Sequence, residues 1–233
     1  MKKRPDAGAQ RLPRWLLSSL LVLLCLVILN WALLRSSAAW NFFAAQSITE
    51  QMHEAGAITP AAIANAQDRL DRALSRFPGH PDYLDLQGHL LELKANRPGV
   101  VGAEREALLE AAAARYRASL SARPLWPYGW ARLLGVKDRL GQVDSEFKTA
   151  MHRAAETGPW EPRVQLQIVQ SGLRHWDRLA RGDRELVQRK GADALKMRPR
   201  EVYELARRYA RPDLVCPDGA GQPQIIRWCK KVL

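Results

Sequence analysis

The sequence has almost no run in which β-branched and polar residues alternate, the pattern expected of half-buried β-strands. Alanine, leucine and arginine are abundant instead, and all three favour helices. Apolar residues make up 47% of the 233 positions, so the chain can bury a sizeable core. We therefore predict an all-α protein with little or no sheet.

The motifs that usually carry catalysis or nucleotide binding are also missing. There is no GxxxxGK[ST], GxGxxG, GxSxG or HExxH pattern, and no histidine has a partner at metal-ligand spacing. Asp144 and Glu146 lie among basic neighbours, and nothing marks them as an acid–base pair. We therefore expect a protein that is not an enzyme and needs no metal or other cofactor.

Charge is absent from residues 15–34, WLLSSLLVLLCLVILNWALL. Twenty helical residues span about 30 Å, the thickness of a hydrocarbon core. Trp15 and Trp31 stand near the two ends, where aromatic rings favour the membrane interface. We predict an uncleaved transmembrane helix over 15–34. The alternative is a cleaved signal peptide, because small residues follow the span at positions 36–39.

The flanking charges predict the orientation of this span. Residues 1–14 contain five lysines and arginines, whereas only Arg35 lies between the span and Glu50. The positive-inside rule therefore makes 1–14 a cytoplasmic segment and puts the rest of the chain across the membrane. In a bacterium this describes a single-pass protein of the inner membrane with a periplasmic domain.

A helical repeat is most clearly seen in residues 123–162. Trp130 and Leu133 suit a first helix, Gly141 a turn, and Phe147 and Met151 the apolar stripe of a second helix. This spacing is typical of tetratricopeptide repeats, which have about 34 residues per helix pair. We predict that 61–215 forms a short tetratricopeptide-like α-solenoid of stacked helix pairs, with the tryptophans of 123–162 packed inside the stack.

The remaining segments are predicted from the same pattern. Residues 35–60 are expected to form a juxtamembrane helix followed by a linker that begins near Glu50, with Thr59 as the cap of the next helix. Gly88 marks the closest approach of two paired helices. The other expected helices cover 61–77, 81–94, 104–122, 162–173, 183–197, 201–209 and 225–231.

Three cysteines are present. Cys25 lies within the span and is interpreted as an apolar filler. Cys216 and Cys229 lie in the C-terminal segment 216–233, and a periplasmic location would favour a disulfide between them. Such a bond would constrain the unfolded chain by roughly 3 kcal/mol. The alternative is two free thiols.

A partner is expected to bind the concave face of the solenoid, which is formed by the first helix of each pair. Repeat position predicts six residues there: His89, Tyr128, Arg132, Arg139, Arg163 and Arg174. Four arginines favour an acidic partner, since guanidinium groups pair with carboxylates and phosphates. Ordinary solvated helix surface is the alternative, and it also suits the net charge of +12.

The segment 123–179 resembles the VpsP-type polysaccharide biosynthesis proteins, which are single-pass membrane proteins with tetratricopeptide-like repeats. The elements WPYGW (126–130) and GPWEP (158–162) carry most of the likeness, with the basic N-terminus and the single span. The resemblance implies a role in bacterial exopolysaccharide production and export. It supplies no catalytic residues.

These observations give one main hypothesis and two alternatives. The main hypothesis is an inner-membrane scaffold that binds proteins of an exopolysaccharide synthesis and export complex. The alternatives are direct binding of an anionic glycan by the basic concave face and assembly of another envelope complex. The lipid bilayer is the other expected partner, and no nucleic acid is expected.

Overall fold

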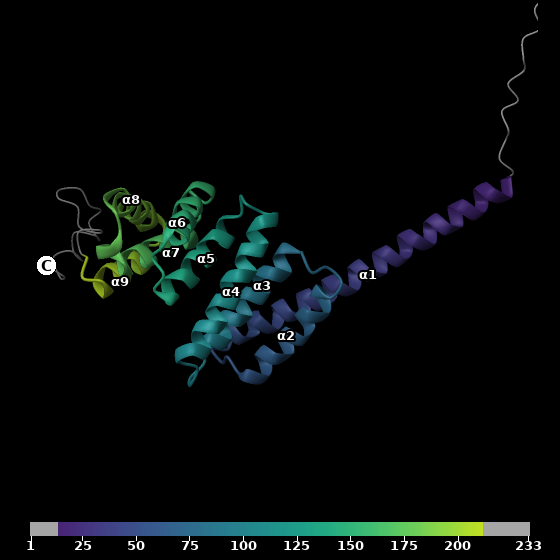
Figure 1. Ribbon diagram of the computed structural model, residues 1–233, viewed down its shortest axis with the longest axis horizontal. Helices are drawn as coiled ribbons and strands as arrows, with labels where there is room; N and C mark the ends of the chain where they lie inside the picture. The colour runs from purple at the N-terminus through teal and green to yellow at the C-terminus, as the bar shows by residue number, and fades with distance from the viewer. Residues whose placement is uncertain (1–13, 212–233) are drawn as a thin grey trace, which may run out of the picture.

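The computed structural model describes residues 14–211, and within this range the chain is helical and contains no strand (Figure 1). The prediction of an all-α protein is confirmed. The elements are α1 (Arg14–Glu54), α2 (Pro60–Leu74), α3 (Pro81–Ala95), α4 (Gly102–Ala122), α5 (Pro127–Leu140), α6 (Ser145–Thr157), α7 (Pro162–Arg174), η1 (Trp176–Arg178), α8 (Arg181–Met197) and α9 (Pro199–Arg208).

Helix α1 has two different halves. Its N-terminal half projects away from the body and is exposed (Figure 1), and it is long and apolar enough to cross a membrane. The C-terminal half continues unbroken to Glu54, so a linker beginning at Glu50 is wrong. Ala38, Ala45 and Met52 are buried there at intervals of seven residues, which keeps them on one face of the helix. This face of α1 packs against α2, and that packing explains why α1 continues as a helix beyond the apolar span.

The rest of the chain forms helix pairs that contact their neighbours in order. α1 packs on α2, α3 on α4, α5 on α6, and α7 on α8, with further contacts between successive pairs (Figure 1). Local signals set two of the boundaries as predicted, although α2 ends at Leu74 rather than 77, and α8 and α9 each begin two residues earlier than expected. Thr59 accepts a hydrogen bond from the Ala62 N–H (3.2 Å) at the start of α2, and Gly141 ends α5 with φ +69°.

The packing of the aromatic residues differs from the prediction in one respect. Tyr116 and Phe147 are fully buried as expected, and Trp130 is half-buried with its Nε1 donating to the Pro124 carbonyl (2.8 Å). Trp126 and Trp160, however, are 39% and 81% exposed. They precede the first turns of α5 and α7, where the chain enters a new helix at the edge of the stack. The prediction that these tryptophans pack inside the stack is therefore wrong for Trp126 and Trp160.

Glycines at two positions allow close helix packing. A Cβ atom on Gly88 would lie 2.7 Å from Tyr116 Cε1, which confirms the predicted close approach within the α3–α4 pair. A Cβ atom on Gly172 would lie 2.2 Å from Val187 Cγ2, so the close packing of α7 against α8 also requires a glycine.

Some predictions lie outside residues 14–211. These are the proposed Cys216–Cys229 disulfide, the C-terminal segment 216–233 and the short helix 225–231. Cys25 lies in the exposed part of α1 as a free thiol.

Candidate binding groove

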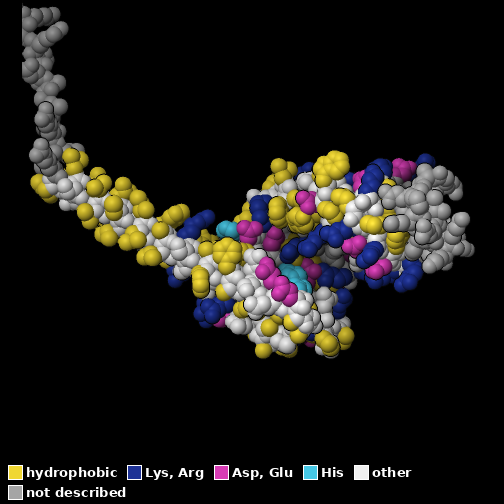
Figure 2. Space-filling model, turned by 180° about the vertical axis from the view of Figure 1, so that it is seen from behind, with side chains coloured by type: hydrophobic (Ala, Val, Ile, Leu, Met, Phe, Trp, Pro, Cys, Tyr) yellow, Lys and Arg dark blue, Asp and Glu magenta, His cyan; other side chains and the backbone are white. Residues whose placement is uncertain are grey.

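A groove of about 760 Å³ runs along the first helices of the successive pairs. We call it the binding groove. Figure 2 shows the hollowed face of the body, where acidic, basic and histidine side chains gather. The lining residues belong to α1, α3, α5 and α7 or to the residue just before α5: Phe42, Gln46, Thr49, Glu50, His53, Glu54, Asp82, Asp85, Leu86, His89, Trp126, Tyr128, Arg132 and Arg163.

Four of the six predicted partner-binding residues line this groove, namely His89, Tyr128, Arg132 and Arg163. The other two are held in ion pairs within the fold. Arg139 pairs with Glu92 on α3, and Arg174 Nη1 lies 3.0 Å from Asp138 Oδ2 on α5. Repeat position thus selected four residues that line the groove, but it could not predict these partners on other helices.

The groove carries less free positive charge than the four predicted arginines would supply. Arg132 is enclosed: its Nη1 donates to the Asp85 carbonyl (3.3 Å), and its guanidinium lies over the Tyr116 ring (5.9 Å). Burial opposes its charge, but Tyr116 and Asp85 outweigh that effect and raise the pKa of Arg132. Arg163 is exposed and has no ion pair within residues 14–211.

The acidic side of the groove is supplied by α1 and α3. Asp82 and Asp85 both pair with Arg123, whose guanidinium nitrogens lie 2.6 and 2.9 Å from their carboxylates. Glu50 and Glu54 are exposed, and neither has an ion pair in the part of the chain that the structure describes. The groove thus presents uncompensated carboxylates on α1 and an uncompensated guanidinium group on α7.

Aromatic side chains line the same groove. The Phe42 ring packs on Tyr83, with centroids 4.9 Å apart, and Trp126 packs on Tyr128 at 5.3 Å. The Tyr128 hydroxyl donates to the Glu161 carboxylate, which raises the pKa of the phenol and fixes the ring. These rigid, half-exposed rings are the kind of side chain that dominates protein recognition sites.

A histidine pair in the groove was missed by the sequence analysis. His53 of α1 and His89 of α3 are 36 positions apart, yet their Nε2 atoms are 3.0 Å apart and their rings are stacked. One imidazole must accept the hydrogen bond and is therefore neutral. Burial, with the nearby Arg132, lowers the pKa of His89 to about 4. Only tertiary packing brings these residues together, so spacing carried no signal.

The lowered pKa of His89 predicts that the protein loses stability in acid. The unfolded His89 has a pKa near 6.5 and the folded one about 4, so between these values the unfolded chain binds more protons. The contribution of His89 to the free energy of unfolding should be fully present above pH 6.5. It should decrease as the pH falls towards 4, by roughly 2 kcal/mol between pH 7 and 5. Urea unfolding at the two pH values measures it. His89→Gln should remove this contribution. His152→Gln, which removes a more exposed histidine and its contact with Asp183 (2.8 Å), should retain the contribution of His89. An unchanged pH dependence in H89Q would contradict the assignment.

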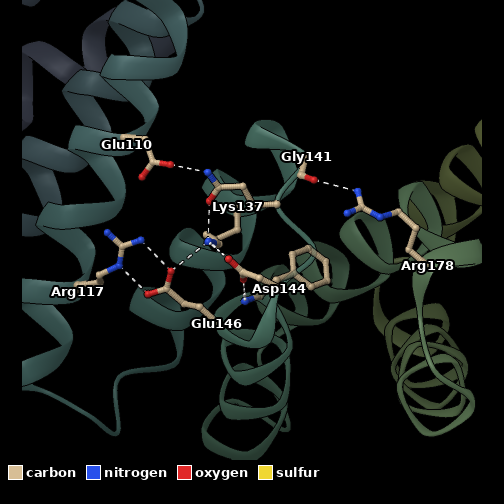
Figure 3. Close-up of polar contacts among 9 residues, drawn as sticks. Glu110, Arg117, Lys137, Gly141, Asp144, Glu146 and Arg178 are labelled. Atoms are coloured by element: carbon tan, nitrogen blue, oxygen red, sulfur yellow. Dashed lines mark hydrogen bonds and ion pairs between the residues drawn. The ribbon is translucent and has the colours of Figure 1, made fainter. Parts of the chain in front are cut away.

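The carboxylates Asp144 and Glu146 lie outside the groove in a structural network (Figure 3). The buried Lys137 ammonium lies 2.5 Å from Asp144 and 3.2 Å from Glu146, and Arg117 lies 2.6 Å from Glu146. Burial alone would raise the pKa of Asp144, but hydrogen bonds from Lys137 and the Phe147 N–H lower it. The hydrogen bond from Arg117 lowers the pKa of Glu146. Both groups are thus held ionised as partners of buried or half-buried cations.

Within residues 14–211, no three histidine, cysteine or carboxylate side chains are placed to hold a metal ion. The lining of the groove offers aromatic faces, carboxylates and a guanidinium group, which together suit recognition. Comparisons of the chain with protein-family models, curated proteins and solved structures find no match.

Proposed function

We propose that the chain is a non-enzymatic, single-pass membrane scaffold whose short tetratricopeptide-like solenoid binds an extended segment of a partner protein in the binding groove. The observation that carries the proposal is the groove itself. It is lined by the first helix of each pair, which is the surface that helical repeats use for binding. Its rigid aromatic rings would supply contact area at low cost in conformational entropy.

The charges of the groove support a peptide more than a uniformly anionic polymer. Glu50 and Glu54 would repel a polyanion, and Arg139 and Arg174 are already paired within the fold. A segment with a basic residue towards α1 and an acidic residue towards Arg163 would complement both sides. Binding of an anionic glycan is thus the weaker of the two hypotheses.

The cellular setting that we propose is bacterial exopolysaccharide synthesis and export, with α1 in the inner membrane and the helical body in the periplasm. Its support is the resemblance of residues 123–179 to VpsP-type proteins, the apolar first half of α1 and the basic residues 1–14. A photo-crosslinking amino acid at Gln46, in the groove, should capture a polysaccharide-synthesis protein in intact membranes. The same probe at Asn65, exposed on α2, is the control.

Charge reversal tests what the groove binds. Replacing Glu50 and Glu54 together with lysine, or Arg163 with glutamate, should each weaken partner capture at Gln46 by about tenfold, equivalent to 1.4 kcal/mol. An acidic glycan would respond differently: the lysine pair should strengthen its binding, and only the arginine change should weaken it. Capture unchanged in both variants would contradict binding in the groove, and recovery of secretion components alone would favour another envelope complex.

A further inference from the structure

Three turns of the helical body lie along one edge, and this edge begins where the apolar span ends. Arg35 directly follows the span, and its guanidinium lies 5.3 Å from the centre of the Phe77 ring in the α2–α3 turn. The α4–α5 turn joins this edge because Arg123 pairs with Asp82 at the start of α3 (2.6 Å). In Figure 1 the edge faces the side from which the free half of α1 departs.

The α6–α7 turn continues the same edge. A Cβ atom on Gly158 would lie 2.7 Å from the Cβ of Pro127, the first residue of α5. Tyr128 of α5 also donates a hydrogen bond to Glu161, just before α7. The turns 75–80, 123–126 and 158–161 are therefore continuous in space, although residues 81–157 separate the first from the last in sequence. The alternate turns 55–59, 96–101 and 141–144 lie at the opposite edge, because consecutive paired helices run antiparallel.

The edge near the span exposes large apolar side chains. Trp160 is 81%, Leu125 74% and Trp126 39% exposed. Trp40 on α1 is 72% exposed and lies six residues beyond the span, about 9 Å above the hydrocarbon, in or just outside the headgroup layer. The opposite edge exposes Ile58 and Val101, and its aromatic rings in the described range, Trp176 and Tyr209, are half-buried, with the Arg211 guanidinium 3.6 Å from the centre of the Trp176 ring. The two edges thus differ in how far they expose the residue type that favours the lipid–water interface.

We infer that this edge, which we call the membrane rim (Phe77, Leu125, Trp126 and Trp160), docks on the lipid surface beside the span. The occupant is lipid because Arg35 fixes one end of the rim at the bilayer surface. Tethering then keeps the other rim residues at a high effective concentration near the headgroups. Transmembrane helices tilt by about 20° on average, and a tilt towards the body would bring Trp160 to the interface.

Docking would also fix the height and orientation of the binding groove, because Trp126 belongs to both the rim and the groove. The groove would then receive a partner segment that runs close to the membrane. This inference rests on α1 crossing the membrane, which is part of the proposed function. The experiment therefore needs a separate readout for the span.

The test uses the full chain in phosphatidylcholine vesicles, with one environment-sensitive fluorophore on one cysteine. In a background of Cys25→Ala, Cys216→Ala and Cys229→Ala, the probe is introduced by Pro159→Cys beside Trp160. The matched control is Pro98→Cys, at an exposed proline of the opposite edge. Spin-labelled lipids with the quencher near the headgroup should quench the probe at 159 several-fold more than the probe at 98. Trp160→Ser, added to the first variant, should abolish the difference.

A third labelled protein keeps Cys25 as its single cysteine and reports on the span; because Cys25 lies at the middle of residues 15–34, its quencher is a spin label deep in the lipid acyl chains. Quenching at 25 together with equal, weak quenching at 159 and 98 would overturn docking and leave the membrane anchor intact. Absence of quenching at 25 would overturn the anchor as well. A probe at 159 that is shielded without lipid quenching, and only at high protein-to-lipid ratio, would mean contact with a second copy and would also overturn lipid docking.

Discussion

Replacing Asp138 with alanine should lower the free energy of unfolding by about 3 kcal/mol. The Asp138 side chain is 1% exposed on α5. Arg174 Nη1 lies 3.0 Å from one carboxylate oxygen, and His175 Nε2 lies 2.9 Å from the other. Removing the carboxylate would leave the half-exposed Arg174 guanidinium and the largely buried His175 imidazole without their anion, between two helix pairs that this contact joins.

The pKa of Asp138 clarifies where this cost comes from. Burial raises the pKa of the carboxyl even though Arg174 and His175 favour its ionised form. The attraction therefore does not fully offset the loss of hydration, and the cluster as a whole is not a large source of stability. The cost of the mutation arises because the remaining groups lose their partner while they stay partly desolvated.

A matched control separates this effect from the general loss of an aspartate. Asp68 also lies in a helix and pairs with an arginine, Arg72, at 2.7 Å, but its side chain is 58% exposed. Asp68→Ala should change stability by less than about 0.5 kcal/mol. Urea unfolding of the full chain in detergent, followed by tryptophan fluorescence, measures both variants. Equal effects of D138A and D68A would contradict the role given to the buried cluster.

The fold could be predicted from local sequence signals because helix boundaries depend on nearby residues. Thr59 and Gly141 mark a start and an end, and α3 covers 81–95 where 81–94 was predicted. The continuation of α1 to Glu54 was missed because Gly56 and Pro60 suggested a linker, whereas the heptad spacing of Ala38, Ala45 and Met52 favours a helix.

The candidate site was predictable only in part, because its chemistry depends on contacts between distant positions. The face that carries Arg132 and Arg163 follows from helix periodicity. The pairing of Arg139 with Glu92, 47 positions away, and of His53 with His89 depends on the stacking of the pairs. A count of arginines therefore overestimated the positive charge that is free to bind a partner.

In the segment that carries the resemblance, too, the packing of helices is easier to infer than the chemistry of binding. Residues 123–179 contain α5, α6 and α7, and their apolar residues form much of the larger core. Gly135 illustrates the point: a Cβ atom there would lie 3.2 Å from the Gln167 side chain of α7, so it serves packing between pairs rather than within its own pair. A likeness in this segment supports a shared way of stacking helices more strongly than a shared ligand.

Replacing Gly172 with alanine should lower the free energy of unfolding by about 3 kcal/mol, near the upper end of the usual cost of overpacking a core. The new Cβ atom would lie 2.2 Å from Val187 Cγ2 and 3.0 Å from Cγ1. Val187 is fully buried, and its β-branched side chain has essentially one accessible χ1 rotamer in a helix. The clash can therefore be relieved only if α7 and α8 separate, which would open the packing around both helices.

Two further variants make this prediction specific to the helix contact. Gly182→Ala in the first turn of α8 meets no atom within 4 Å, so it should leave stability unchanged or raise it by less than about 1 kcal/mol. Val187→Ala alone should cost stability by leaving a cavity, but combined with Gly172→Ala it provides the space that the new methyl group needs. The double variant should thus be more stable than the sum of the two single changes predicts, by at least about 1 kcal/mol. Strict additivity would mean that the destabilisation by Gly172→Ala does not arise from its contact with Val187.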